Sequence, residues 1–236
     1  MRATILENSW IPHDPTPKQA EFLLMPDIEV LFGGSAGGGK SDALLMAALQ
    51  YVEVPGYAAI LFRRTYADLS LPGALMDRAH EWLQGTAAHW SEKNKTWTFP
   101  SGATLSFGYL ESENDKYRYQ SAEFQFIGFD ELTQFTETQY RYLFSRLRRL
   151  EGSKIPLRMR SASNPGGVGH EWVKQRFIIG NKPFIPASLD DNPYIDREGY
   201  IKSLMHLDPV TREQLLKGDW TARDAGNKFK REWFEI

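Results

Sequence analysis

Residues 31–41, LFGGSAGGGKS, decide the fold of this chain. From Gly34 onward they fit the pattern G-x-x-x-x-G-K-[ST], the glycine-rich loop that wraps around phosphate groups. A β-prone run over residues 28–32 enters this loop, and a helix-prone run over residues 42–49 leaves it. Strand, glycine loop and helix in that order are the context that the pattern requires. The sequence therefore predicts an α/β nucleotide-binding fold built around a P-loop.

The residue types of the loop match the chemistry of phosphate binding. Glycines let the backbone approach phosphate closely and point successive N–H groups at it, beside the positive end of the following helix. We expect Lys40 to reach the β and γ phosphates and the hydroxyl of Ser41 to ligate Mg²⁺. The predicted nucleotide-binding loop comprises Gly34, Ser35, Ala36, Gly37, Gly38, Gly39, Lys40 and Ser41.

A pair of acids follows the mostly apolar run of residues 124–129, which is typical of a buried strand. This strand is predicted to deliver Asp130 and Glu131 to the carboxyl edge of a parallel sheet, where nucleotide binds. We expect Asp130 to hold Mg²⁺ together with Ser41, and Glu131 to orient and deprotonate the attacking water. Adjacent acids at a strand end also occur by chance, and the P-loop upstream is what favours the catalytic interpretation.

Two other segments carry candidate nucleotide contacts. Gln19 lies near the start of a short predicted helix upstream of the P-loop, and its amide both donates and accepts, as the N6 and N7 edge of adenine requires. Arg63 and Arg64 follow the apolar run of residues 57–62, which we interpret as another parallel strand. They leave that strand at the nucleotide edge, where one of them could contact the γ phosphate; the alternative is that both are structural partners of acids.

Composition limits the class of protein. A chain of 236 residues, 42% of them hydrophobic, can fill the core of one α/β domain with a small appendage. It contains no cysteine, which excludes disulfides and thiolate metal sites. No apolar run is long enough for a membrane span, so we expect a soluble, intracellular protein with no membrane partner.

The distribution of charge is uneven. The net charge of −2 does not indicate an autonomous nucleic-acid binder. Residues 141–182, however, hold ten basic and only two acidic residues. Such a block is either a solvated face or a surface that meets phosphate or a neighbouring subunit, and the sequence leaves both interpretations open.

Hydrophobic periodicity predicts the remaining elements. Residues 96–109 alternate around a Pro-Ser-Gly turn, which indicates a β-hairpin. Residues 136–150 carry apolar residues at helical spacing and predict one helix. Residues 157–163 alternate as a strand that ends in small polar residues. From residue 184 onward the pattern changes to helical stretches, which predicts a small helical cap rather than more sheet.

Together these motifs resemble the N-terminal ATPase domain of the large terminase subunit of tailed bacteriophages, the motor that packages double-stranded DNA into a procapsid. The P-loop alone is not specific to this family, but an ordered set of motifs over nearly the whole chain is. The set comprises residues 16–19 (TPKQ), the P-loop, and residues 62–66 (FRRTY), 129–133 (FDELT), 144–148 (FSRLR), 161–165 (SASNP), 191–193 (DNP) and 216–220 (LKGDW).

The resemblance implies a P-loop NTPase of the additional-strand, helicase-like (ASCE) type, with a mainly parallel sheet flanked by helices and a small, mostly helical lid subdomain. We expect the ATPase core over residues 1–182, with residues 1–27 on the adenine side, and the lid and linker over residues 183–225. Residues 226–236 would begin the junction to a nuclease domain. Full-length relatives continue into such an RNase H-like domain, so we expect no DNA cleavage by this chain alone.

The resemblance also implies Mg²⁺-dependent ATP hydrolysis and assigns residues to it. Lys40, Asp130 and Glu131 would be catalytic, Ser41 and Asp130 would hold Mg²⁺, and Gln19 would read adenine. The motif that couples hydrolysis to movement aligns with Ser161, Ala162, Ser163 and Asn164.

One position departs from many relatives, which carry an arginine in the P-loop where this chain has Ala36. If such an arginine is needed within the subunit, Arg63 or Arg64 is the expected substitute. Arg118, Arg146 and Arg148 are the candidates to act on the site of a neighbouring subunit.

The partners implied are double-stranded DNA, the portal protein and the small terminase subunit. The family acts as a homo-oligomeric ring, usually of five, in the host bacterial cytoplasm and transiently at the procapsid portal; we expect an isolated domain to be a monomer. One alternative is another P-loop motor, a helicase or remodeller, although no second motor domain is evident. The other is a nucleotide-dependent docking module with little turnover.

Overall fold

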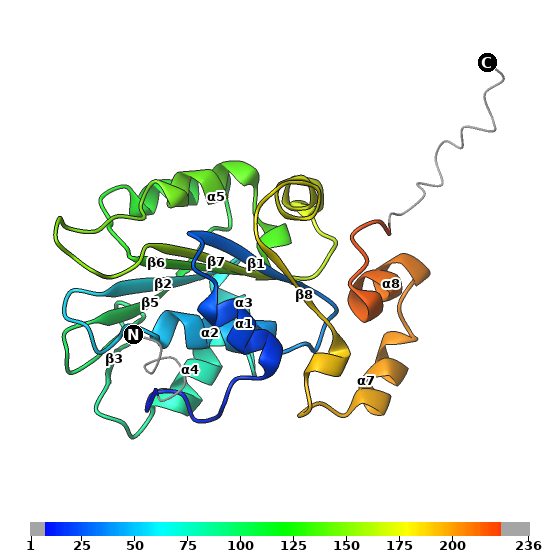
Figure 1. The fold of residues 1–236 in the computed structure, drawn as a ribbon, viewed down its shortest axis with the longest axis horizontal. Coiled ribbons are helices and arrows are strands. Elements are labelled where there is room, and N and C mark those ends of the chain that lie inside the picture. Colours follow the sequence, from blue (N-terminus) through cyan, green and yellow to red (C-terminus); the bar gives the residue numbers. More distant parts are fainter. Residues whose placement is uncertain (1–7, 223–236) are drawn as a thin grey trace, which may run out of the picture.

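An eight-stranded sheet forms the centre of the computed structural model, which describes residues 8–222 of the chain (Figure 1). The strand order is β3-β4-β5-β2-β6-β7-β1-β8. The strands are β1 (Glu29–Gly34), β2 (Ala58–Arg63), β3 (His89–Ser91), β4 (Thr96–Thr98), β5 (Thr104–Tyr109), β6 (Phe126–Asp130), β7 (Arg158–Ser163) and β8 (Phe184–Ala187). All neighbouring pairs from β5 across to β8 are parallel, and β3, β4 and β5 pair antiparallel. The mainly parallel sheet and the hairpin of β4 and β5 are confirmed.

The position of β7 defines the type of P-loop fold. β1 leads into the P-loop, β6 ends at the two acids, and β7 lies between them and pairs with both. Every residue of β1 and β6 is buried, as expected of central strands in a parallel sheet with covered faces. This extra strand is the predicted additional-strand arrangement. It brings the carboxyl ends of β1, β7 and β6 together at one sheet edge.

Helices cover both faces of the sheet (Figure 1). One layer consists of α1 (Pro17–Leu24), α2 (Lys40–Leu49), α3 (Tyr66–Ser70) and α4 (Leu75–Leu83), and the other contains α5 (Glu137–Phe144) and α6 (His170–Val173). A hydrophobic core lies under each layer, with Leu44 in the first and Phe129 in the second. Within residues 8–222, three short 3-10 helices, η2 (Glu113–Tyr119), η3 (Leu132–Gln134) and η5 (Leu189–Asp191), and a π-helix, η4 (Lys174–Ile179), complete the connections.

The structure corrects the expected boundary between core and lid. We expected residues 183–225 to be a helical lid, but Phe184–Ala187 form β8, which pairs in parallel with β1. So short a strand gives a weak pattern, and Pro186, which an edge strand tolerates, weakens it further. The two expected helices are present as α7 (Arg197–Leu204) and α8 (Pro209–Lys217), at the side of the sheet (Figure 1). The expected junction over residues 226–236 lies outside the described residues.

The helix α5 is shorter than predicted, because it ends at Phe144 rather than near residue 150. Beyond it the chain pairs with the segment that precedes β6: the N–H of Phe124 donates to the Arg146 carbonyl at 3.0 Å, and the N–H of Arg148 donates to the Phe124 carbonyl at 2.9 Å. Leu147 still packs against the core, so the apolar spacing continues after the helix has ended. The FSRLR motif thus runs from the end of α5 to the edge of the sheet opposite the P-loop.

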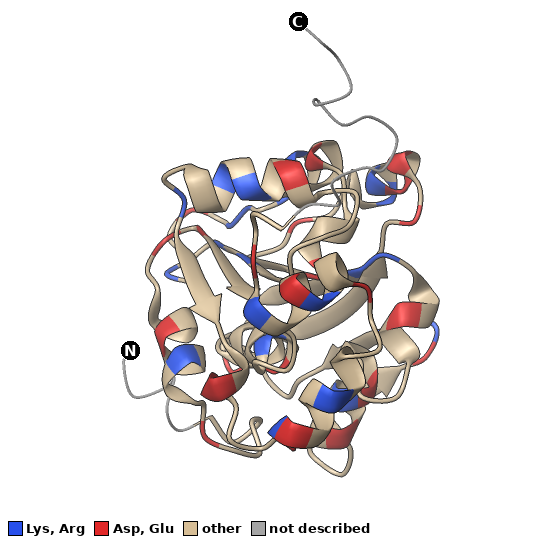
Figure 2. Cartoon of the chain, turned by 90° about the vertical axis from the view of Figure 1, so that its right-hand side faces the viewer, with Lys and Arg blue, Asp and Glu red and all other residues tan. Residues whose placement is uncertain are grey.

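The basic block of residues 141–182 does not form one continuous basic face. Arg158 and Arg160 lie in β7 and are buried, and the Arg160 guanidinium donates to the carbonyls of Met25 and Asp27 at 2.8 and 2.9 Å. Burial lowers the pKa of Arg160 to about 9. Arg176 and Lys182 pair with the buried Glu29. Figure 2 shows basic and acidic residues interspersed over the face that it presents.

Within residues 8–222 there is no helix of sufficient length and apolarity to span a membrane.

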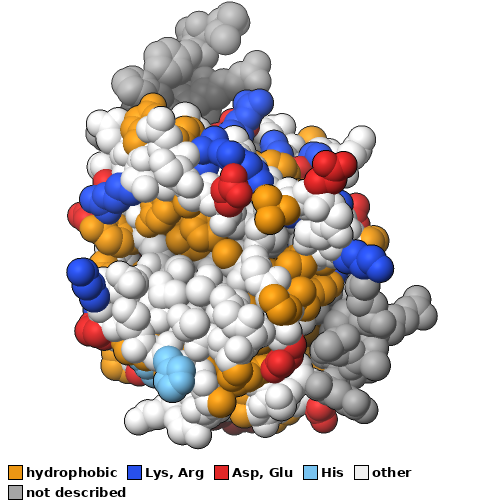
Figure 3. All heavy atoms as spheres, turned by 90° about the vertical axis from the view of Figure 1, so that its left-hand side faces the viewer, with side chains coloured by type: hydrophobic (Ala, Val, Ile, Leu, Met, Phe, Trp, Pro, Cys, Tyr) orange, Lys and Arg blue, Asp and Glu red, His pale blue; other side chains and the backbone are white. Residues whose placement is uncertain are grey.

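The face of the molecule at the starts of the parallel strands exposes groups of hydrophobic side chains (Figure 3). A cavity of about 490 Å³ opens among the loops that precede β2 and β7, with Tyr51, Val54, Leu150 and Ile155 in its lining.

Candidate nucleotide-binding site

The P-loop connects β1 to α2 and curls at the carboxyl edge of the sheet. Gly37 and Gly39 have φ values of +77° and +73°, which L side chains disfavour. At Gly34 the requirement for glycine is also steric, because a Cβ there would lie 2.2 Å from the carbonyl oxygen of Ala187 in β8. That carbonyl accepts the N–H of Ser35 at 2.9 Å. The glycine pattern therefore reflects both the curvature of the loop and its close contact with β8.

Lys40, the first residue of α2, is buried inside the loop. Its ammonium group donates to the carbonyl of Ser35 at 2.6 Å. Burial lowers the pKa of Lys40 to about 8, against the opposing attraction of Glu131 and Asp130. A buried ammonium group with few hydrogen-bond partners is stabilised strongly by a phosphate anion. The position of Lys40 therefore suits its expected contact with the β and γ phosphates.

Ser41 and Asp130 meet across the sheet edge, as the sequence predicted for a shared magnesium site. The Ser41 hydroxyl donates to Oδ1 of Asp130 at 2.8 Å. Mg²⁺ prefers oxygen ligands and commonly takes one or two from protein, with phosphates and water completing the octahedron. The described residues contain no cluster of three or more His, Cys, Asp or Glu side chains that could hold a metal alone. The hydroxyl and carboxylate therefore fit Mg²⁺ that arrives with a nucleotide.

Glu131 follows Asp130 in an uncommon backbone conformation. Its φ and ψ are 55° and 56°, in the left-handed region, and among the described non-glycine residues only Lys95 shares a positive φ. Such strain costs roughly 1 to 3 kcal/mol and clusters at functional sites. Burial, followed by the adjacent charge of Asp130, raises the pKa of the Glu131 carboxyl. A raised pKa makes this carboxylate a stronger proton acceptor than an exposed one.

Arg63 ends β2 beside the two acids. Its Nη1 lies 3.1 Å from Oδ2 of Asp130 and 3.8 Å from Oε1 of Glu131, and 18% of its side chain is exposed. The structure therefore brings Arg63, and not Arg64, into contact with the acid pair. Of the two arginines proposed to act within the subunit, Arg63 has the geometry.

The predicted coupling residues connect this acid pair to the next element. Ser161 and Ala162 are buried in β7, where Ala162 lies opposite Asp130. The Ser163 hydroxyl donates to Oγ1 of Thr133 at 3.0 Å, and the backbone N–H of Asn164 hydrogen-bonds to the Glu131 carboxylate. A shift of the Glu131 side chain would therefore act directly on the Asn164 backbone.

The lid contacts the P-loop through hydrogen bonds that the sequence did not predict. The N–H of Ala36 donates to the carbonyl of Leu215 in α8 at 2.7 Å. Asn192 Nδ2 donates to the carbonyl of Gly37 at 2.6 Å. Asn192 belongs to the DNP motif, which marked this residue as a candidate for a functional contact. No sequence motif includes Leu215.

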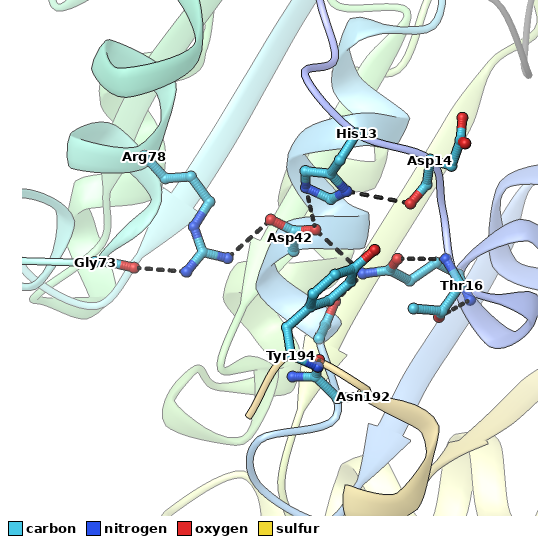
Figure 4. Close-up of polar contacts among 10 residues, drawn as sticks. His13, Asp14, Thr16, Asp42, Gly73, Arg78, Asn192 and Tyr194 are labelled. Carbon is cyan, nitrogen blue, oxygen red and sulfur yellow. Dashed lines mark hydrogen bonds and ion pairs between the residues drawn. The ribbon is translucent and has the colours of Figure 1, made fainter. Parts of the chain in front are cut away.

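Gln19 lies next to the P-loop, in a network centred on Asp42 in the first turn of α2 (Figure 4). Its Nε2 donates to the Gly39 carbonyl at 2.9 Å and to Asp42 at 3.2 Å. Its Oε1 accepts the N–H of Thr16 at 2.8 Å, which closes the capping box of α1. The capping function of this glutamine was not predicted from the sequence, and its expected contact with adenine stays a prediction.

The same network includes residues that sequence reasoning missed. Asp42 accepts from His13 Nε2 at 3.2 Å and from Arg78 Nη1 at 3.0 Å. A cavity of about 390 Å³ adjoins the network, with Gln19, Asp42, Asn192 and Tyr194 in its lining. These side chains come from the N-terminal segment, α1, α2, α4 and the lid, and no local pattern connects them.

The three arginines proposed to act on a neighbouring subunit lie at different places. Arg118 in η2 follows β5 at the P-loop edge of the sheet, 3.0 Å from Asp115 and with its guanidinium 4.7 Å from the centre of the Tyr109 ring. Arg146 and Arg148 lie at the opposite edge, where Arg148 pairs with Glu123 at 3.3 Å. Of the three, Arg118 shares an edge with the nucleotide site.

The sheet order, the loop and the acids at the end of β6 define the class of protein as a P-loop NTPase of the additional-strand type. Residues 31–236 match the family described as the terminase large subunit, T4likevirus type, N-terminal part, and the chain belongs to this family. A comparison with curated proteins gives no match.

Solved structures with a similar fold include three terminases. The large terminase of a thermophilic bacteriophage is 14% identical, with a TM-score of 0.68 over 88% of this chain and 54% of that chain. That of bacteriophage HK97 is 11% identical, with a TM-score of 0.60 over 88% and 51% of the two chains. The ATPase domain from Thermus phage P74-26 is 14% identical, with a TM-score of 0.58 over 87% and 93%. The chain thus spans about half the length of the first two.

Proposed function

We propose that this chain is the ATPase part of a phage DNA-packaging motor, which hydrolyses ATP with Mg²⁺ to drive double-stranded DNA into a procapsid. The observation that carries the proposal is the meeting of Lys40, Ser41, Asp130 and Glu131 at one sheet edge in a member of the terminase family. A glycine loop that merely turned the chain would need neither a buried lysine nor a pair of acids at its mouth. The large terminase of the thermophilic bacteriophage, one of the structural relatives, has been solved in complex with ATP-γ-S.

The side chains support attack of water on the γ phosphate. The P-loop N–H groups and Lys40 stabilise the charge that develops on the phosphate oxygens. Glu131, with its raised pKa, accepts the proton of the attacking water. Mg²⁺ held by Ser41 and Asp130 would neutralise charge on the β and γ phosphates. Arg63 supplies a cation beside the acids, which suits a substitute for the missing P-loop arginine.

Gln19 supports a preference for adenine over guanine. Both protons of its Nε2 are used by Gly39 and Asp42, whereas its Oε1 has one partner, Thr16, and keeps a second lone pair. An acceptor in this position suits the N6 amine of adenine and repels the O6 of guanine. The chain should therefore bind ATP more tightly than GTP.

The proposal includes the assembly in which a motor of this kind works. Subunits would form a ring on the portal, with the small terminase subunit and DNA as further partners, in the host cytoplasm. Arg118 is the arginine best placed to reach a neighbour from the P-loop edge. Its side chain is half exposed, and an exposed ion pair such as the one it forms with Asp115 contributes little, so the guanidinium can exchange partners readily.

Concentration dependence of turnover is the experiment that tests the proposed function. If an arginine of one subunit completes the site of the next, phosphate release from Mg-ATP per molecule should rise with protein concentration, several-fold across the range in which subunits associate. We expect Arg118→Ala to abolish this rise and Arg141→Ala, a change of an exposed arginine on α5, to leave it intact. Absence of phosphate release at every concentration, with nucleotide bound, would favour the docking module.

Nucleotide affinity is expected to depend on pH through Lys40. The phosphates prefer the protonated ammonium, and its pKa of about 8 in the free protein means that the proton is lost as pH rises through 8. The contribution of Lys40 to ATP affinity should therefore be constant below pH 7, and its loss should lower the affinity by roughly tenfold between pH 7 and pH 9. Calorimetric titrations at pH 8 in buffers of different ionisation enthalpy should show uptake of about half a proton. Uptake of none would mean that Lys40 is already fully charged in the free protein.

A further inference from the structure

The cavity beside Asp42 adjoins the end of the P-loop, because Gly39 is part of its lining. The loop ends at Gly39, whose carbonyl accepts from Gln19, and α2 then presents Asp42 to the cavity. A nucleotide whose phosphates lie in the loop therefore directs its sugar and base toward this space. Asp42 already accepts from His13, Gln19 and Arg78. Besides the second lone pair of Gln19 Oε1, the groups in the lining that can contact the face of a purine ring are the aromatic side chains of His13, Tyr194 and Trp82, and Trp82 is already packed against His13.

His13 forms a fixed wall of this cavity. Its Nε2 is 3.2 Å from Asp42, and its Nδ1 is 3.2 Å from the carbonyl of Asp14 (Figure 4). The His13 ring packs against the ring of Trp82 in α4, with the ring centres 5.4 Å apart and the planes nearly perpendicular. Three contacts from different elements set the orientation of the imidazole.

Tyr194 forms the opposite wall and differs from His13 in its freedom. Its side chain is 74% exposed, and its ring centre lies 6.1 Å from that of His13. Its backbone N–H donates to Asn192, whose amide in turn donates to the carbonyl of Gly37 in the P-loop. The tyrosine is therefore attached to the loop by its backbone while its ring remains free to turn.

We propose that His13 and Tyr194 form the two walls of a slot for the purine ring of the bound nucleotide, with Tyr194 turning outward to admit the ring and then stacking on it. This inference rests on the proposed function, because it names the base contacts of the same nucleotide site. Aromatic rings stack with centres about 4.5–7 Å apart, so the present 6.1 Å leaves no room for a third ring until Tyr194 moves. The exposure of Tyr194 provides that movement at little cost.

The hydrogen bond of Asn192 to the P-loop connects the slot to the phosphate-binding loop. Asn192 contacts the carbonyl of Gly37 at 2.6 Å, so the segment that carries Tyr194 follows any movement of the P-loop. The base contact and the phosphate contact are thus linked through one short stretch of the lid.

Binding measurements with and without a base test the slot. Calorimetric affinities for Mg-ATP and for magnesium tripolyphosphate, which has no base, are measured on the wild type, Tyr194→Ala, Tyr194→Phe and Tyr117→Ala. Tyr117 is a matched control, since it is also an exposed tyrosine but lies on η2. We expect Tyr194→Ala to weaken ATP binding by roughly tenfold and Tyr194→Phe to retain it, since base stacking on an aromatic ring is typically of this size. Tripolyphosphate binding should be unchanged in all variants.

The outcomes separate the slot from the proposed function. If the wild type binds ATP and Tyr194→Ala binds it equally well, the slot is wrong while the proposed function stands. If Tyr194→Ala weakens tripolyphosphate as much as ATP, the tyrosine acts through the P-loop and not on the base, and the slot is again wrong. A wild type that binds no ATP overturns the proposed function and the slot together.

Discussion

Replacing Glu131 with glutamine is expected to lower the rate of ATP hydrolysis by about 10³-fold, while ATP affinity changes by less than about threefold. The substitution keeps the size of the side chain and its ability to accept the Asn164 N–H, but removes the group that takes a proton from water. It also removes a negative charge beside Asp130, which favours binding of the nucleotide anion slightly. A selective loss of turnover is therefore the signature of a general base.

The measurement is single-turnover phosphate release from Mg-ATP, with affinity taken from a separate equilibrium titration. Glu137→Gln is a suitable control, because Glu137 is the first residue of α5 and its ion pair with Arg141 is exposed. Turnover by Glu131→Gln within about threefold of the wild type would assign the proton acceptor to another group. In that case the left-handed backbone conformation of Glu131 could not be explained by a function in catalysis.

The positions of the candidate site residues could be predicted from the sequence because Asp130 and Arg63 each end a strand and Lys40 follows a loop that begins at the end of β1. In a parallel sheet, Lys40, Asp130 and Arg63 need only the correct strand assignment to be placed at one edge, since topology brings strand ends together. Both β6, an apolar and fully buried run, and β1, which ends in glycines, have a strong local pattern. The choice between Arg63 and Arg64 required coordinates, because successive residues of a strand point to opposite faces.

The parts that the sequence missed depend on contacts between distant segments. β8 is four residues long, and its pairing with β1 is not visible in its own composition. The end of α5 was missed for a similar reason, since pairing with Phe124 overrides a helical spacing that continues to Leu147. The cavity beside Asp42 draws on several distant segments, and His13 has no motif around it. Local patterns predict elements, whereas contacts between lid, N-terminal segment and P-loop follow only from packing.

The attachment of the lid to the P-loop leads to a prediction of comparable size. Gly218 caps α8 with a φ of +66°, and a Cβ there would lie 2.5 Å from the Ser35 nitrogen and 2.6 Å from the carbonyl carbon of Gly34. Backbone atoms of the P-loop cannot yield as a flexible side chain would. We therefore expect Gly218→Ala to displace α8 from the loop, to destabilise the fold by about 3 kcal/mol and to weaken ATP binding at least about tenfold.

Gly73 supplies the matched control, because its φ is +76° and no atom lies within 4 Å of the position that a Cβ would occupy. Gly73→Ala should cost only the conformational penalty of a left-handed alanine, about 1 kcal/mol, and leave ATP binding unchanged. Chemical denaturation gives the two free energies of unfolding, and calorimetry gives the two affinities. Equal changes in stability and in ATP affinity for the two variants would contradict the prediction, because they would show that the close contact of Gly218 with the P-loop has no energetic effect. A larger effect of Gly218→Ala on ATP affinity alone, with no larger loss of stability, would show that the contact positions the P-loop for nucleotide but does not stabilise the fold.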